Sequence, residues 1–352
     1  MGLGIAIAIG GTIDAELAAA SSVEVQQRAG EPTTFTLRYD VDVADGDLPM
    51  LVDERVDPGA ELSVLVPVES EQLCLVKGLV HAQQIHFQHG GARSWVEVRG
   101  SDSSIRMDRT ANATVWSNVT DADVVTAIVG QYGFVPDVES TEARHTEDRH
   151  TLVQRDTDYR FVRRLGRRTG RLFWITSDAF GVETAHFRRP PVDDAAVATL
   201  TINDRPPSIR SLDITWDVEQ PTAAQALQLD LRSLGDLDGA ATRSPLTTLG
   251  TDAFADIVDE PRETHSAAPS DDAGDARARS EGTLIESGWF LRATCETTLE
   301  TLGVVLRPAQ VVEIAGAGSR HSGSYFVESV RHTIDSSSHR MALELVRNGW
   351  GT

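Results

Sequence analysis

The fold is decided by the segments WVEVRGSD (95–102), TDADVVTAIVGQYGF (120–134) and LVQRDTDYRFVRRLGRRTGRLFWI (152–175). The first segment alternates apolar and polar residues, as a strand does. In the second, Thr120 and Asp123 form a capping-box pattern, an apolar helical face follows, and Gly133 ends it. The third predicts a helix that begins near Asp156 and ends at Gly170, followed by an aromatic strand. None of these patterns is typical of an active site, so the segments indicate a scaffold.

Strand patterns dominate both ends of the chain. Residues 1–100 contain short alternating segments separated by turn-forming residues, which favours a small barrel or sandwich. Residues 101–200 mix helix and strand patterns, and alternating segments return near the carboxyl end. We therefore predict an α+β, mostly β protein. It would comprise a first β-barrel-like module at 1–100, an α/β region at 101–200 and a second β-barrel-like module at 201–352.

Two acidic stretches interrupt these patterns. RETHSAAPSDDAGD at 262–275 has the lowest complexity in the chain and too few apolar residues to fold alone, which predicts a mobile acidic surface loop. The next residues, 276–290, predict a helix, although Gly282 and Gly288 disfavour one. DVDVADGD at 40–47 loosely resembles a calcium-binding loop, but its glycine is out of register and no bidentate glutamate follows at the required place. We expect an acidic turn there.

Composition limits the possible partners. The chain has 352 residues, a length typical of roughly two or three domains, and a net charge of −21. That charge disfavours nucleic acid and anionic lipid as bulk partners. The opening MGLGIAIAIGG has no basic leader and is too short to cross a bilayer. We expect a protein made in the cytoplasm with no signal peptide and no membrane-spanning segment.

No motif of a common enzyme or metal site is present. The sequence lacks G-x-S-x-G, H-E-x-x-H and a Cys–His arrangement, so we predict no catalytic residue, no cofactor and no metal site. Cys74 and Cys295 each lie in an apolar run, which favours inert core thiols, although a disulfide stays open. His81, His86 and His89 alternate along expected strands, which favours surface histidines over a zinc site.

The strongest electrostatic feature is a cluster of arginines on and beside one predicted helix. Its members are Arg155, Arg160, Arg163, Arg164, Arg167, Arg168 and Arg171. One interpretation is a solvated helix face whose arginines pair with the many carboxylates of this chain. A second is a contact surface for an acidic partner protein, and a third is nucleic-acid binding, which no interleaved aromatic residues support. The candidate interface residues are Arg160, Arg163, Arg164, Arg167 and Arg168.

Three ordered stretches resemble the tail-hub family of phages and contractile injection systems, which includes the phage late-control protein D group and the hub portion of VgrG-type spike proteins. The first is VEVRGSDSSIRMDRT (96–110) with VWSNVTDADVVTAIVGQYGF (115–134), and the second is the arginine-rich segment at 152–175. The third is AQVVEIAGAGSRHSGSYFVESVRHTID (309–335), with an SG-x-Y-x-V-x-x-V-x-H core at Ser322–His332. Each motif is degenerate, so the resemblance rests on their order and spacing.

The resemblance implies a structural role. In this family, two barrel-like modules flank an α/β region, and three copies form a ring that adapts a hexameric tail tube to a trimeric spike. It implies a non-enzymatic baseplate hub that acts as a homotrimer in a virion tail or injection particle of the contractile type, beside tube and baseplate wedge proteins. The sequence continues only to Thr352, without the OB-fold and needle that VgrG-type proteins carry, so a separate spike protein is expected. The alternatives are a nucleic-acid-binding or acidic-partner-binding module that uses the helix at 155–171, and a cell-wall hydrolase of the tail tip.

Overall fold

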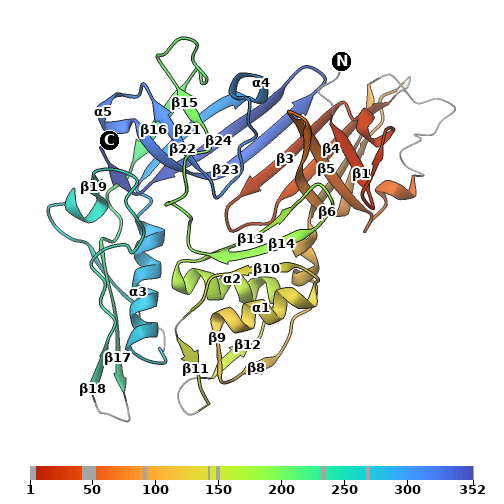
Figure 1. Ribbon diagram of the computed structural model, residues 1–352. Coiled ribbons are helices and arrows are strands. Elements are labelled where there is room, and N and C mark those ends of the chain that lie inside the picture. Colours follow the sequence, from red (N-terminus) through yellow and green to blue (C-terminus); the bar gives the residue numbers. More distant parts are fainter. Residues whose placement is uncertain are drawn as a thin grey trace.

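A computed structural model describes residues 5–41, 53–89, 93–141, 143–147, 151–230, 235–266 and 270–351. Within these residues, one large sheet runs through both ends of the chain, and an α/β layer lies beneath it (Figure 1). The fold class is therefore mostly β with a separate helical part, as predicted. The expected acidic turn at 40–47 lies largely outside the described residues.

The large sheet has 13 strands among the described residues. Its order is β16 (Leu212–Trp216), β21 (Leu291–Thr298), β24 (His339–Arg347), β23 (Gly323–Asp335), β3 (Ser22–Arg28), β4 (Thr34–Val41), β7 (Ser94–Asp102), β6 (Glu71–His86), β5 (Glu61–Val68), β1 (Ala6–Ile9) and β2 (Thr12–Asp14). Two further strands, β22 (Val311–Ala315) and β15 (Thr199–Thr201), branch from β23. Strands from the two ends of the sequence therefore share one sheet.

The described strand pairs close neither half into a barrel, so the two expected barrel-like modules are open and parts of one sheet. The long strand β23 explains the difference. One edge of β23 pairs with β22 at Gly323–Phe326 and then, beyond a bulge at Val327/Ser329, with β3 at Ser329–Asp335. Since β3 occupies the edge that closure would need, the sheet continues into the other half. The main core lies across this seam, with Val25 and Val98 from one half and Val312 and Leu345 from the other.

The α/β layer has its own core. The helices α1 (Asp121–Gln131) and α2 (Asp158–Thr169) pack on a small sheet of β10 (Val135–Val138), β14 (Glu183–Arg188) and β13 (Leu172–Ser177). Short pairs complete the layer: β8 (Thr114–Trp116) with β12 (Leu152–Gln154), and β9 (Val119–Thr120) with β11 (Arg144–His145). The β13–β14 hairpin was predicted from its two alternating segments and is confirmed.

A third helix connects the carboxyl-terminal half to this layer. The helix α3 (Ala273–Ser287) lies beside α2 in Figure 1. The sequence predicted this helix at 276–290, three residues after its actual start. Gly282 does not break it, because α2 and α3 meet at a pair of glycines. A Cβ on Gly282 would lie 2.7 Å from the backbone nitrogen of Gly170, so no larger residue fits there.

The segment 262–275 is more ordered in structure than its composition predicts. Its residues Glu263–Ser266 form β20, which pairs with β17 (Ala223–Asp230), and β17 also pairs with β18 (Gly235–Asp238). The side chains of Asp271 and Asp275 are buried at the start of α3. The prediction of a mobile surface loop is therefore wrong for the described residues of this segment. Residues 263–266 pair with a neighbouring strand, and the carboxylates of Asp271 and Asp275 are paired within the protein. Residues 267–269 lie outside the described part of the chain.

The remaining elements are short. They are η1 (Leu17–Ala19), η3 (Glu54–Val56), η4 (Ser103–Asp108), η5 (Phe254–Asp256), α4 (Leu299–Leu302), α5 (Gly318–His321) and the pair β19 (Asp252–Ala253) with β25 (Gly349–Trp350). None of the helices in the described part of the chain combines the length and apolar character needed to cross a bilayer.

Candidate interface on the arginine-rich helix

Local sequence explains why α2 forms where it does. The Thr157 side chain accepts a hydrogen bond from the backbone nitrogen of Arg160, and Gly170 ends the helix in the left-handed conformation at φ 69°. Phe161, Val162 and Leu165 are buried against the α/β core. Because these apolar residues occupy the buried face of α2, the arginines lie on the other faces of an amphipathic helix.

Four of the five candidate arginines keep their guanidinium groups at or near the surface. Arg160, Arg164 and Arg167 have side chains that are 69%, 50% and 74% exposed. Their nearest carboxylates are Asp108 at 3.2 Å, Asp156 at 2.7 Å and Glu286 at 3.9 Å, respectively. Arg163 lies with its guanidinium carbon 5.6 Å from the centre of the Tyr159 ring.

These pairings fit the interpretation of a solvated face that is balanced by the chain's own carboxylates. Exposed ion pairs contribute only about 0–1 kcal/mol each, so a partner that supplies better-placed acids could replace them. The geometry therefore leaves the outer face of α2 able to contact a partner, and its interface role stays a prediction.

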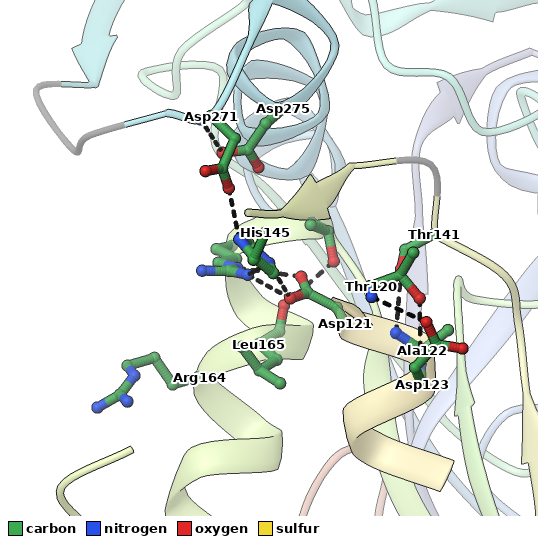
Figure 2. A network of polar contacts seen from close by, with 12 residues as sticks. Thr120, Asp121, Ala122, Asp123, Thr141, His145, Arg164, Leu165, Asp271 and Asp275 are labelled. Atoms are coloured by element: carbon green, nitrogen blue, oxygen red, sulfur yellow. Dashed lines mark hydrogen bonds and ion pairs between the residues drawn. The ribbon is translucent and has the colours of Figure 1, made fainter. Parts of the chain in front are cut away.

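Arg168 differs from the other four because it is turned inward, into a buried network. Its guanidinium contacts Asp121. The Asp121 carboxylate also lies 2.8 Å from His145 Nε2 (Figure 2). The other ring nitrogen of His145 contacts Asp271. The network joins α2 (Arg168), α1 (Asp121), β11 (His145) and the segment before α3 (Asp271), so it ties the α/β layer to the carboxyl-terminal half.

The network fixes the charge of His145. Burial by itself would lower the pKa of this imidazole, but its hydrogen bonds to Asp121 and Asp271 outweigh that effect and raise the pKa to about 9. Burial likewise acts to raise the pKa of Asp121, and His145 and Arg168 hold it below the usual value. Two cations, His145 and Arg168, thus balance the carboxylates of Asp121 and Asp271. Asp275 extends the arrangement by accepting from the Asp271 backbone nitrogen at 3.1 Å and from Arg279 Nη2 at 2.9 Å.

An aspartate–histidine pair can serve as the base of a nucleophilic enzyme, but this one is placed for a structural role. The His145 ring is fully buried, and both of its nitrogens contact carboxylates, so it has no free nitrogen with which to take a proton from a substrate. Sequence reasoning missed this network entirely. The only local signal was Asp121 at the first position of a capped helix, where an acid is ordinary.

The histidines and cysteines considered in the sequence do not form a site. His81, His86 and His89 are exposed, with His81 Nε2 at 2.9 Å from Ser101 Oγ and the His86 ring stacked on Trp95 at 5.5 Å. Cys74 and Cys295 are free and buried, as expected for core thiols. Burial raises their pKa values to about 11 and about 12. The described residues contain no group of three or more His, Cys, Asp or Glu side chains that could hold a metal ion.

Comparison with known proteins identifies a family and a fold. Residues 3–205, more than half of the chain, match the family model of the Alg8 N-terminal domain. No curated protein matches the chain. Among solved structures, the chain is similar to the 43 kDa tail protein of prophage MuSo2 from Shewanella oneidensis, with a TM-score of 0.70, 14% identity and 98% coverage of each chain.

Two further solved structures are similar to this chain over most of its length. A tail protein from Neisseria meningitidis has a TM-score of 0.70 and 13% identity, covering 99% of this chain and 97% of that one. An E. coli component of the type VI secretion system, which is itself similar to the T4 tail proteins gp27 and gp5, has a TM-score of 0.59 and 14% identity. That match covers 95% of this chain and 76% of the other. The fold of this chain is therefore shared with phage tail proteins and with a component of the type VI secretion system.

Proposed function

The chain belongs to the Alg8 N-terminal domain family, and we propose that it is a structural, non-enzymatic baseplate hub of a contractile phage-like tail or injection particle. The observation that carries the proposal is the shared fold over nearly the whole chain with phage tail proteins. In the proposed particle, the chain forms a homotrimer that adapts a hexameric tube to a separate trimeric spike.

The strand arrangement supports this role. Each copy contains two β-rich halves that join through β3 and β23, so three copies would supply six similar sheet regions around a ring. A surface of that kind suits a sixfold partner on one side while the true threefold axis suits a trimeric partner on the other. We propose the division at 1–100, 101–200 and 201–352 as the corresponding modules, with α3 crossing from the last module onto the middle one.

The proposal includes partners that the isolated chain does not identify. These are the tube protein, a spike protein and baseplate wedge proteins, all assembled after synthesis in the cytoplasm. Of the alternatives, binding to an acidic partner is compatible with the hub role, because the outer face of α2 carries four exposed or half-buried arginines.

The test is assembly with candidate tube and spike proteins encoded beside this chain. Purified chain would be studied by native mass spectrometry alone and in the mixture, and the mixture would be imaged in negative stain. We expect a trimer mass and rings with threefold averages that carry a tube on one face. A chain that stays monomeric at every concentration and in every mixture would contradict the proposal.

A further inference from the structure

A pocket of about 270 Å³ lies where the helical layer meets both halves of the large sheet. It lies between the turn after β3, the carboxyl end of α2, the end of α3 and the strands β21, β23 and β24. Its basic lining residues are Arg28, Arg163, Arg167, Arg171 and Arg292, and its acidic ones are Glu31, Glu286 and Glu328. A positively charged pocket is unexpected in a chain with a net charge of −21.

Two of the three carboxylates of the pocket are already engaged. Glu328 lies 3.2 Å from Arg28 and 2.7 Å from Arg292, and Glu286 lies 3.9 Å from Arg167. For Arg163, the described part of the chain supplies only the Tyr159 ring as a partner. The pocket therefore keeps positive charge that its own acids do not neutralise.

Arg171 supplies an independent sign of a missing partner. Its side chain is only 7% exposed, and its Nη2 atom donates to Glu139 at 2.9 Å and to the Ser140 carbonyl at 3.0 Å. Its Nε atom is buried and has no hydrogen-bond partner among the described residues. A buried donor without an acceptor costs about 1–3 kcal/mol, so the surroundings of Arg171 do not satisfy its guanidinium fully.

The pocket is also partly apolar. Leu172, Phe173, Ile285 and Trp289 line it, and the Trp289 ring is stacked on Phe326 with 5.4 Å between ring centres. A simple inorganic anion would leave these apolar side chains uncovered, whereas a carboxylate next to an aliphatic side chain would match both the charged and the apolar lining residues. The volume suits one or two side chains, since pockets for drug-sized ligands begin at about 300 Å³.

We propose that this pocket binds a short peptide segment of a partner protein in which an acidic side chain stands beside an apolar one. The acid would face Arg163 and Arg171, and the apolar side chain would lie on Trp289. The proposal rests on the charges and shape of the isolated chain, so it is separate from ring formation. It gives Arg163, on α2, and Arg171, just after α2, a defined ligand class.

The experiment measures peptide binding to the full chain by calorimetry. The probe is a capped tetrapeptide that alternates glutamate and leucine, and its partner probe replaces glutamate with glutamine. We expect binding of the glutamate peptide and at least about tenfold weaker binding of the glutamine peptide, because a charge-assisted bond is lost. The double variant Arg163→Gln/Arg167→Gln should weaken the glutamate peptide by at least about tenfold, since both substituted arginines line the pocket.

The matched control is Arg160→Gln, which neutralises an exposed arginine of the same helix outside the pocket and should leave the affinity unchanged. Circular dichroism of each variant checks that folding is retained. Several outcomes would overturn the proposal: no binding of the glutamate peptide, equal binding of both peptides, equal weakening by the control variant, or binding of citrate or single-stranded DNA in place of the peptide. Self-association that the double variant abolishes would also overturn it, because the occupant would then be a second copy of this chain.

Discussion

Asp121 Oδ1 lies 2.8 Å from His145 Nε2, although the two residues are 24 positions apart and belong to different elements. The same imidazole contacts Asp271, which precedes α3 in the carboxyl-terminal half. A single protonated histidine is thus shared between two buried carboxylates from two parts of the chain. The contact between the α/β layer and α3 depends on this shared charge as well as on apolar packing.

Replacing the shared histidine should be strongly destabilising. In the variant His145→Ala, the carboxylates of Asp121 and Asp271 stay buried while their common partner is lost. Removing one member of a buried ionic cluster costs about 3–5 kcal/mol, and urea unfolding would measure it. The control is His89→Ala at an exposed position, which should change the free energy of unfolding by no more than about 0.5 kcal/mol. Equal stability of the two variants would contradict the role of the network.

The same histidine predicts a loss of stability at alkaline pH. Its pKa is about 9 in the folded protein and about 6.5 in an unfolded chain, so the folded state binds the proton more tightly. The contribution is therefore complete below pH 6.5 and disappears as the pH rises through 9. The difference in unfolding free energy between the wild type and His145→Ala should shrink between pH 6 and pH 10. A constant difference over that range would show that His145 does not carry the charge.

Sequence reasoning located the helices well because their limits are set locally. Thr120 caps α1 with both hydrogen bonds of the capping box, and Thr157 and Gly170 delimit α2 within two residues of the expected start. Such signals involve residues at most a few positions apart. For this reason they can be recognised without knowledge of the rest of the fold.

Contacts between distant residues could not be predicted in the same way. The pairing of β23 with β3 brings Val330 opposite Gln27, and no pattern within either strand specifies that partner. That pairing replaces barrel closure with one continuous sheet. The network of His145 was missed for a related reason, because Asp271 lies in a stretch whose composition indicates disorder. The three domain boundaries stay predictions.

A second histidine site predicts the opposite pH dependence. His332 and His339 are buried at the seam between the halves, with His332 Nδ1 3.0 Å from His339 Nε2 and His332 Nε2 3.2 Å from Gln27 Oε1. Burial lowers the pKa of both rings, and that of His339 to about 4. The unfolded chain therefore binds protons that the folded protein excludes.

Stability from these neutral histidines is present above pH 6.5 and is lost as the pH falls toward 4. For His339 alone the loss is on the order of 3 kcal/mol, from the shift between about 6.5 and about 4. Urea unfolding at pH 7 and pH 4.5 would compare the wild type with His332→Gln/His339→Gln. We expect the wild type to lose more stability than the variant over that range. A variant that is equally acid-sensitive would assign the effect to carboxylates instead.

Two glycines predict opposite responses to the same substitution. A Cβ on Gly78 would lie 2.0 Å from the carbonyl oxygen of Ser101 on the neighbouring strand, so Gly78→Ala must push β6 and β7 apart. Gly130 lies inside α1, and a Cβ there would meet no atom within 4 Å. Because alanine is the better helix former, Gly130→Ala should stabilise the protein by up to about 1 kcal/mol, while Gly78→Ala should destabilise it by about 2 kcal/mol or more. Thermal unfolding of both variants measures the contrast, and a stable Gly78→Ala protein would place β6 and β7 further apart than the structure has them.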